Sequence, residues 1–365
     1  MFSAVKEKYF SPNQNIGPRV NNFNIIRFLA AAMVIYGHMA HIMGVAVPCI
    51  YGQAVSTIAV KILFVISGYL VMKSLMNDAR FGRYMIRRSF RIFPGLIGVV
   101  LFSTLVVGLI FTGLPKKEYL LSGSTWLYLK NIVFYPIYSL PGVFANYTYP
   151  NAVNGSLWTL PIEFALYLVL PLFLVIFRKI KIERAGLIAV TVLCIAANIA
   201  RLKYFPDARY VFYGTNWFDA LTILPYFFAG SVLALPEFKN IFNIQIAFIM
   251  LLVAAIFKFG SVKYELILSL ILPYSVLSFS LTEKPVFSRW FEKSDYSYGL
   301  YLYGFVIQQA VYHQIEKLKL PFFSLNISFL ICFVCTFICA FVSWHLIEKP
   351  SQKLCKSILE KMRKK

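Results

Sequence analysis

Long apolar stretches recur along the whole chain, separated by short polar segments. About ten of them are long enough for a helix that crosses a bilayer, which needs roughly 20 mostly apolar residues. They lie near residues 24–46, 54–76, 93–113, 157–177, 185–201, 217–235, 242–258, 264–281, 296–313 and 322–347. The pattern predicts an all-α, polytopic membrane bundle of about ten transmembrane helices. It begins after a cytoplasmic segment at 1–20, ends before a basic cytoplasmic tail at 351–365, and carries no appended soluble domain.

Composition agrees with this prediction. The chain is 59% hydrophobic and only 14% charged, and its mean hydropathy is +0.69, which is typical of polytopic membrane proteins and excludes a single soluble core. The first apolar stretch follows some twenty polar residues and lacks a small-residue cleavage site, so we expect a retained helix rather than a removed signal peptide.

The distribution of lysine and arginine predicts the orientation. With the N-terminus inside, the inner segments hold 24 of the 36 basic residues and the outer segments hold ten. Because basic residues concentrate in cytoplasmic loops, both termini are expected in the cytoplasm. This topology also explains most of the net charge of +21, so no nucleic-acid partner is expected.

The six cysteines do not predict a metal site or a disulfide framework. Cys332, Cys335 and Cys339 recur at helical spacing in the last apolar stretch. Three thiols in a lipid-phase helix with no nearby fourth ligand more often pack than bind a metal ion. No metal is therefore expected.

Arg27 and His38 are charged or titratable side chains within residues 24–38, the otherwise apolar first part of the first stretch. Each costs several kcal/mol in a bilayer unless it is paired or used. Their separation of eleven positions gives a net rotation of about 20° and a rise of roughly 16 Å, so both lie on one helical face. The residues between them on that face, Ala30, Ala31 and Val34, are small. The spacing predicts a path for a long polar molecule from Arg27 to His38.

The polar segment after the second apolar stretch is strongly basic. On a helical wheel Arg80, Arg83, Arg87 and Arg91 share one side, opposite apolar side chains, which predicts an amphipathic helix at the cytoplasmic surface over 76–94. One interpretation is an anchor for anionic lipid. The other is a phosphate clamp, because guanidinium groups bind phosphate oxygens bidentately.

The longest outer segment, about 114–156, mixes turn-forming residues with tyrosines and asparagines. Aromatic and amide side chains suit stacking on sugars and bonding to hydroxyl groups. Tyrosines of an interfacial loop also lie at the level of the lipid headgroups, so both interpretations stay open.

Five motifs follow one another in order along the chain: Arg27 with His38, FVISGYL at 64–70, RRSFRIFP at 87–94, GSLWTLPIE at 155–163 and SYGLYL at 297–302. Together they resemble the membrane acyltransferase 3 family, and the resemblance runs over 21–350. It implies a ten-helix membrane enzyme that takes an acyl group, usually acetyl, from cytoplasmic acyl-CoA. The acceptor implied is a hydroxyl of an extracytoplasmic glycan. Some members carry a further C-terminal hydrolase-like domain that completes the transfer; direct transfer by the bundle is expected here.

A sugar hydroxyl is very weakly acidic, so acyl transfer to it needs a base, and histidine is the usual choice. His38 is the expected base; it could instead be acylated transiently as a nucleophile, or merely bond to a neighbouring helix. Glu163 is expected to orient His38 and hold its charge, or else to bond to an arginine or tryptophan in the bundle. Lys61 is expected to snorkel towards the interface and has no catalytic role. The residues expected at acyl-CoA are Arg27, Ser67, Arg80, Arg87, Arg88 and Arg91.

The resemblance, together with these residues, implies an acyl-CoA-dependent O-acyltransferase of the bacterial inner membrane, with acetyl-CoA the expected donor. It would modify a lipid-linked or polymeric glycan such as an O-antigen, capsule or exopolysaccharide. The competing class is a polytopic carrier or polymerase of lipid-linked glycans, which would not need a basic helix facing cytoplasmic CoA. The sequence leaves open the sugar, the hydroxyl, the length of the acyl group and the oligomeric state.

Overall fold

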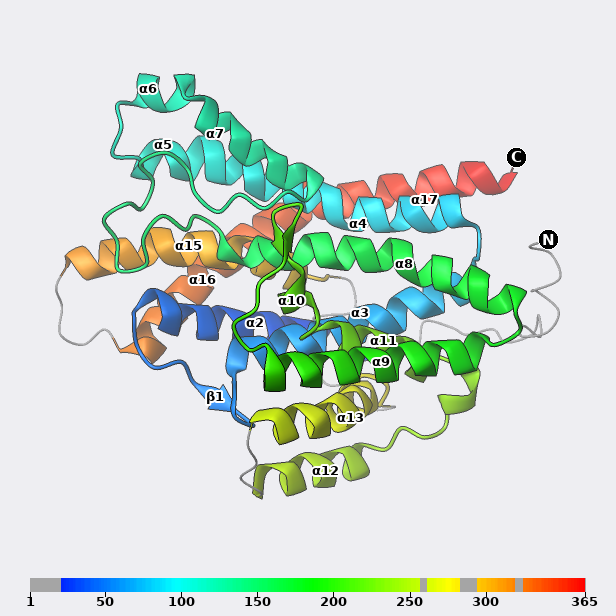
Figure 1. Cartoon of the computed structure of the whole chain (residues 1–365). Helices are drawn as coiled ribbons and strands as arrows, with labels where there is room; N and C mark the ends of the chain where they lie inside the picture. Colours follow the sequence, from blue (N-terminus) through cyan, green and yellow to red (C-terminus); the bar gives the residue numbers. More distant parts are fainter. Residues whose placement is uncertain (1–20, 257–260, 283–293, 319–323, 365) are drawn as a thin grey trace.

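The computed structural model describes residues 21–256, 261–282, 294–318 and 324–364, and these residues fold into a helical bundle (Figure 1). The expected cytoplasmic segment at 1–20 lies outside the described residues. The first half of the bundle contains α2 (Phe23–Ile42), α3 (Val55–Asn77), α4 (Phe81–Leu101), η1 (Phe102–Val107), α5 (Gly108–Phe111), α6 (Lys116–Leu121), α7 (Gly123–Leu127), η2 (Tyr128–Val133), η3 (Gly155–Trp158) and α8 (Thr159–Lys179). The second half contains α9 (Glu183–Tyr204), α10 (Trp217–Ala220), α11 (Leu224–Leu233), η4 (Pro236–Phe238), α12 (Ile244–Ile256), α13 (Ser261–Ser280), α15 (Ser297–Lys317), α16 (Leu325–Ser343), η5 (Trp344–Glu348) and α17 (Lys349–Lys364).

Strand structure in the described residues is limited to two short antiparallel hairpins. β1 (Cys49–Ile50) pairs with β2 (Gln53–Ala54), and β3 (Val211–Phe212) pairs with β4 (Thr215–Asn216). All four strands have two residues. The prediction of an all-α bundle is confirmed at this level.

Seven helices in the described part of the chain are long and apolar enough to cross a membrane. They are Phe23–Ile42, Val55–Asn77, Phe81–Phe111, Gly155–Lys179, Glu183–Tyr204, Val262–Ser280 and Leu325–Arg363. Large apolar side chains such as Leu193, Ile249 and Leu330 are exposed on the outside of the bundle, as expected for surfaces that face lipid rather than water. The chain is therefore a multi-pass membrane protein.

The bundle has two distinguishable ends. Figure 1 shows the turns at 78–80 and 180–182 and the end of α17 on the right, and we call this the basic end. The β1–β2 hairpin lies on the left, as does the long connection over 112–154, and we call this side the loop end.

Two glycines allow α3 and α11 to cross in close contact. A Cβ atom at Gly68 would lie 1.9 Å from the carbonyl oxygen of Phe227, and one at Gly230 would lie 2.2 Å from that of Val65. Small residues let helix backbones approach in this way when packing in a membrane provides the association energy. Ser231 Oγ donates to the carbonyl of Gly68 at 3.2 Å and bonds the two helices at the crossing.

Three boundaries differ from the sequence-based expectations. The basic segment is not a separate surface helix, because it begins α4 and continues through η1 and α5 to Phe111. The stretch at 217–235 is divided into α10 and α11 by a turn. The last apolar helix does not end near 347, since η5 joins α16 to α17 without a break, and the expected basic tail is therefore helical.

Lys61 is buried rather than snorkelling. Its Nζ lies 2.5 Å from Glu265 Oε2 and 2.6 Å from Gln53 Oε1, and its side chain is 1% exposed. Glu265 also accepts hydrogen bonds from Gln53, Asn198 and Tyr226 at 2.6, 2.9 and 3.0 Å. An ion pair with further hydrogen bonds on both sides explains how two charges persist inside the bundle.

Candidate active site

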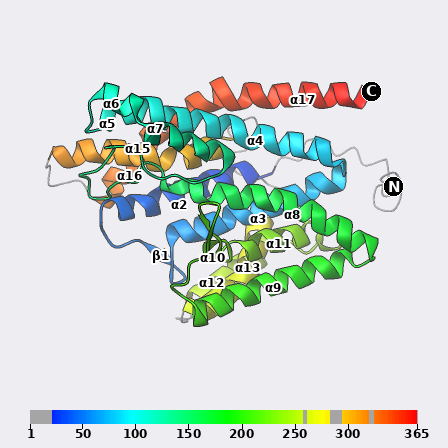
Figure 2. The ribbon, with the colours of Figure 1, turned by 45° about the horizontal axis from the view of Figure 1, so that its top comes forward.

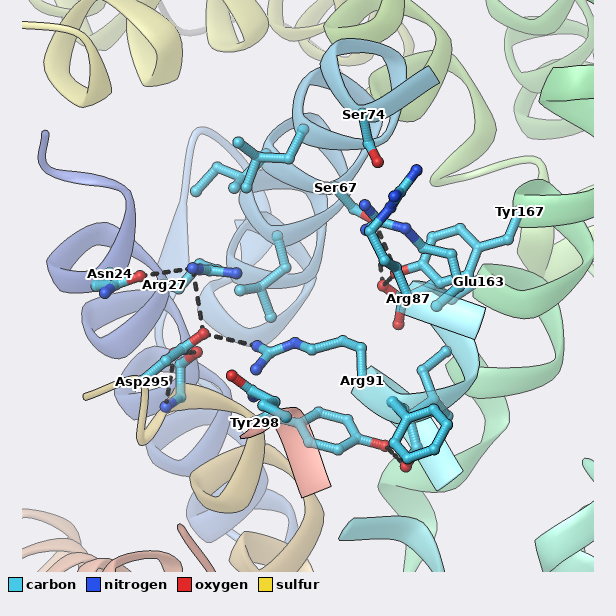
Figure 3. A pocket seen from close by; sticks show the side chains of 18 of the residues that line it. Asn24, Arg27, Ser67, Ser74, Arg87, Arg91, Glu163, Tyr167, Asp295 and Tyr298 are labelled. Atoms are coloured by element: carbon cyan, nitrogen blue, oxygen red, sulfur yellow. Dashed lines mark hydrogen bonds and ion pairs between the residues drawn. The ribbon is translucent and has the colours of Figure 1, made fainter. Parts of the chain in front are cut away.

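A cavity of about 1090 Å³ extends into the bundle between α2, α3, α4, α8, α15 and α17. Of the residues expected at acyl-CoA or in catalysis, the structure brings six to its wall: Arg27, Ser67, Arg87, Arg88, Arg91 and Glu163. Figure 3 shows five of them pointing inward from several helices. We call this space the donor cavity, after the substrate that we propose for it.

One carboxylate joins two of the expected arginines across the donor cavity. Asp295 Oδ2 lies 3.1 Å from Arg27 Nη2 and 2.6 Å from Arg91 Nη2 (Figure 3). Asp295 also accepts from the backbone N–H of Ser297 at the start of α15. Burial alone would raise the pKa of Asp295, but Arg27 and Arg91 together hold it well below its usual range. Asp295 is therefore a fixed anion that orients both guanidinium groups.

Glu163 lies deeper in the donor cavity and bonds to two hydroxyl groups. Its Oε1 accepts from Tyr167 OH at 2.6 Å and from Ser67 Oγ at 3.1 Å (Figure 3). These contacts join α8 to α3. Neither of the two partners expected for Glu163, His38 or an arginine or tryptophan, hydrogen-bonds to it among the described residues.

Three arginines on the basic face of α4 already have partners within the protein. Arg87 lies 3.3 Å from Asp78, and Arg83 donates to the carbonyl of Leu359 at 2.9 Å. Arg80 is 61% exposed, pairs with Asp78 at 3.1 Å and does not line the cavity, so the structure does not place it with the other arginines. Burial would raise the pKa of Asp78, but hydrogen bonds and ion pairs from Arg80 and Arg87 hold it below its usual value.

Arg88 is the cavity arginine that remains available. Its guanidinium lies over the rings of Tyr84 and Tyr167, at 5.6 and 5.4 Å from their centroids, and this cation–π contact holds it in place. Within the described ranges no carboxylate forms an ion pair with it, so its hydrogen-bond donors can meet an anion that enters the cavity.

The tail helix α17 supplies a further basic wall. Figures 1 and 2 both show α17 alongside α4, and Lys349, Lys353 and Lys356 line the donor cavity from it. Together with Lys73 and the four arginines, these lysines outnumber the lining acidic residues Asp78, Glu163 and Asp295. The excess of positive charge favours an anionic ligand at the basic end.

A second cavity of about 880 Å³ lies towards the loop end. Its wall comes from the segment 138–158 and from 201–219. We call it the acceptor cavity, after the substrate that we propose for it. One short stretch of chain contributes to both cavities, because Gly155 and Trp158 line the acceptor cavity and Thr159 and Leu160 line the donor cavity. We call 155–160 the partition.

His38 does not line the donor cavity, and its link to the partition runs through the ring of Phe305. Its ring packs edge-on against Phe305, with centroids 5.3 Å apart. Phe305 follows Tyr301, a donor-cavity residue, by one turn of α15. Phe305 also contacts two acceptor-cavity residues, since its ring lies 5.9 Å from that of Tyr149 and a Cβ at Gly155 would approach it to 2.9 Å.

The expected lane between Arg27 and His38 is closed. Ala30, Ala31 and Val34 are at most 1% exposed and pack into the hydrophobic core against neighbouring helices. The open route runs instead along α3, α4, α8 and α15 to the hydroxyls of Thr159 and Tyr301, which lie 2.5 Å apart. The small residues therefore admit close helix packing rather than a ligand.

Several residues of this site have no counterpart in the sequence-based reasoning. The sequence alone did not indicate a role for Asp295, Asp78, Tyr167 or the lysines of α17. Asp295 offered one usable signal, since it lies two residues before the SYGLYL motif in a chain with only 15 acidic residues. Among the described residues, no group of three or more His, Cys, Asp or Glu side chains could hold a metal ion.

Comparison with known proteins identifies the family. A model of the acyltransferase domain known as acyltransferase 3 matches residues 20–345. The chain belongs to this acyltransferase family. It is 28% identical to an O-acetyl transferase of Shigella phage Sf6 over 90% of this chain and 95% of that protein. It is 26% identical to nodulation protein 10 of Rhizobium leguminosarum bv. viciae over 95% of this chain and 97% of that protein.

More distant relatives include the peptidoglycan O-acetyltransferase OatA of Listeria monocytogenes, at 27% identity over 68% of this chain and 44% of that protein. No solved structure matches the chain. In this acyltransferase, residues from all five motifs line the donor cavity: Arg27, Ser67, Arg91, Glu163 and Tyr298. His38 contacts Phe305, which packs against Gly155. The family motifs therefore converge on one site.

Proposed function

We propose that the protein is an O-acyltransferase of a bacterial inner membrane. It takes an acyl group, which we propose to be acetyl, from cytoplasmic acyl-CoA and places it on a hydroxyl of an extracytoplasmic glycan. The observation that carries this proposal is the donor cavity, whose basic end gathers cations from α2, α3, α4 and α17. Membership of the family, together with relatives named as O-acetyl transferases, supports the reaction type.

The donor would enter the cavity with its phosphates at the basic end. Arg88 has no ion-pair partner among the described residues, and Lys353 and Lys356 line the same cavity from α17, so phosphate oxygens would meet both guanidinium and ammonium groups. The pantetheine arm would pass the Arg27–Asp295–Arg91 bridge and bring the thioester towards Thr159 at the partition.

The reaction then needs a proton acceptor and an acyl acceptor at the partition. The glycan hydroxyl oxygen attacks the thioester carbonyl carbon, the carbon–sulfur bond breaks, and an ester and a CoA thiolate result. His38 would take the hydroxyl proton and return it to the thiolate. Glu163, held by Ser67 and Tyr167, would hold positive charge near the cavity and order its inner wall.

Transfer of labelled acetyl from acetyl-CoA is the direct test. Purified protein in lipid vesicles should transfer radiolabel to a surface polysaccharide whose esters have been removed with mild alkali. The label should be recovered as an alkali-labile ester. Absence of transfer, with acetyl-CoA neither bound nor consumed, would contradict the proposal and favour a glycan carrier or polymerase.

Reversal of charge at Arg88 is expected to weaken donor binding selectively. Arg88→Glu should raise KM for acetyl-CoA by about tenfold or more, because it removes a charge-assisted bond to phosphate and adds repulsion. KM for the glycan should stay close to that of the wild type. Arg88 is a sharper choice than Arg91, whose reversal would also break the ion pair with Asp295.

Lys361→Glu provides the matched control, since Lys361 is exposed on α17 and does not line the donor cavity. It changes the net charge of the protein equally but should leave KM for acetyl-CoA near its wild-type value. Equal increases in the two variants would show a general surface potential and would contradict a phosphate site at Arg88.

A further inference from the structure

We infer that the acceptor cavity binds a sugar unit of the acceptor glycan, and that Trp158, Tyr149, Arg201 and Asp219 recognise it. This inference rests on the proposed function and assigns its second substrate to a place. The acceptor cavity has the volume of an ordinary small-molecule site, about 880 Å³. The partition also contributes residues to its wall and to that of the donor cavity.

The side chains around the acceptor cavity match the chemistry of a sugar. Tyr138, Tyr149 and Trp158 line it with aromatic rings, whose faces suit the apolar C–H face of a pyranose and whose polar tips suit its hydroxyls. Asn151 and Asn216 add amide groups that donate and accept hydrogen bonds. A ligand with both an apolar face and many hydroxyls would match these aromatic rings and amide groups.

The charges around the acceptor cavity favour a sugar over a phosphate group. Arg201 and Arg209 are balanced by Asp207 and Asp219 on the same wall. A phosphate or diphosphate would be repelled by the two carboxylates, whereas sugar hydroxyls donate to carboxylates and accept from guanidinium groups. This balance contrasts with the net positive wall of the donor cavity.

Arg201 and Asp219 are both placed to serve a ligand. Within the residues that the structure describes, Arg201 forms no ion pair, and its Nε is buried without a hydrogen-bond partner. Asp219 Oδ2 accepts a single hydrogen bond, from Asn216 at 2.9 Å, so it has capacity for more. Both side chains line the acceptor cavity.

The position of the acceptor cavity fits the reaction. Tyr149 and Gly155 on its wall contact Phe305, and Phe305 packs against His38. A hydroxyl of a sugar in the acceptor cavity would therefore face the proposed base across one aromatic ring. Displacement of the Phe305 side chain would bring the hydroxyl, the imidazole and the thioester together at the partition.

The test compares variants of the acceptor cavity with neighbours that do not line it. Tyr149→Ala and Arg201→Gln are paired with Tyr204→Ala and Lys203→Gln, which alter exposed residues at the end of α9 outside the cavity wall. The probes are acetyl-CoA and the surface polysaccharide freed of esters, and both KM values and direct polysaccharide binding are measured in vesicles. Each cavity variant should raise KM for the polysaccharide about tenfold and weaken its binding similarly. KM for acetyl-CoA should not change, and both controls should behave as the wild type.

The alternatives give different results. Unchanged polysaccharide binding and KM in both cavity variants, with transfer intact, would overturn the assignment of the cavity and leave the proposed function standing. Competition by inorganic pyrophosphate at millimolar concentration for polysaccharide binding would overturn it in favour of a phosphate site. Failure of the proposed function looks different, because the wild-type protein would then leave acetyl-CoA unreacted, and this inference would fall with it.

Discussion

Replacement of His38 by glutamine is expected to lower the rate of acyl transfer about 10²- to 10⁴-fold, the usual contribution of a general base. Glutamine keeps a polar group of similar reach but cannot take up a proton. Binding of acetyl-CoA should remain near the wild-type value, because His38 does not line the donor cavity. Single-turnover transfer of radiolabelled acetyl, measured beside equilibrium binding, separates the two effects.

His41→Gln is the matched control. His41 lies one turn further along α2 and is exposed, so its loss should leave the transfer rate within about threefold of the wild type. Transfer by the His38→Gln variant at the wild-type rate would show that the base lies elsewhere. The Glu163 carboxylate would then be the next candidate, since it lines the donor cavity and can take up a proton.

The same preparation distinguishes the two roles proposed for His38. A nucleophilic histidine would take acetyl from acetyl-CoA without a glycan, so label would appear on the protein and CoA would be released in an initial burst. A base would leave the protein unlabelled and would release CoA only with the glycan present. The ring of Phe305 contacts both His38 and the acceptor-cavity residue Gly155. Either role therefore requires the Phe305 side chain to move.

The apolar pattern predicted the helical bundle well because a membrane helix needs an uninterrupted run of apolar residues, which is visible in the sequence. A helix that crosses a bilayer must satisfy its own backbone bonds and present apolar side chains over about 20 residues. The pattern could not show where helices end when two continue into each other. The α4 helix carries its basic face into an apolar one, and α16 continues into the basic α17. A change in composition is therefore not a break in structure.

The candidate site was predictable only in part, for a similar reason. The residue types of Arg27, Arg91 and Glu163 are costly in a membrane, which draws attention to each of them. Their partners are set by tertiary packing. Arg91 is separated from Asp295 by 204 positions, and no local period connects them. The small residues between Arg27 and His38 likewise have two physical uses, a ligand path or close packing, and only the assembled bundle shows that they pack.

Neutralising one member of the Lys61–Glu265 pair is expected to destabilise the bundle by about 3–5 kcal/mol, because the remaining charge stays buried without its partner. Glu265→Gln keeps the shape of the side chain and leaves the Lys61 ammonium without a carboxylate. Lys61→Met removes the cation and leaves Glu265 with neutral donors only, from Gln53, Asn198 and Tyr226. The free energy of unfolding, or the Tm in detergent where unfolding is irreversible, measures the loss.

A more exposed ion pair in the same protein provides the control for this loss of stability. Arg178 and Glu183 lie 3.2 Å apart with side chains 27% and 37% exposed, and a solvated ion pair contributes about 0–1 kcal/mol. Glu183→Gln should therefore shift the Tm little. A similar small shift in Glu265→Gln would contradict the buried pair, since it would mean that water or another anion reaches Lys61.

The double variant Lys61→Met with Glu265→Gln decides between a lost attraction and an unpaired charge. If the cost of each single variant is the desolvated charge left behind, removing both charges should recover most of the stability, because the glutamine amide oxygen at position 265 can still accept from Asn198 and Tyr226. If the pair instead adds a large net attraction, the double variant should be as unstable as either single one. The former is expected, since desolvation of two buried ions offsets most of their attraction. Donor binding at Arg88 should persist in the double variant, because Lys61 and Glu265 do not line the donor cavity.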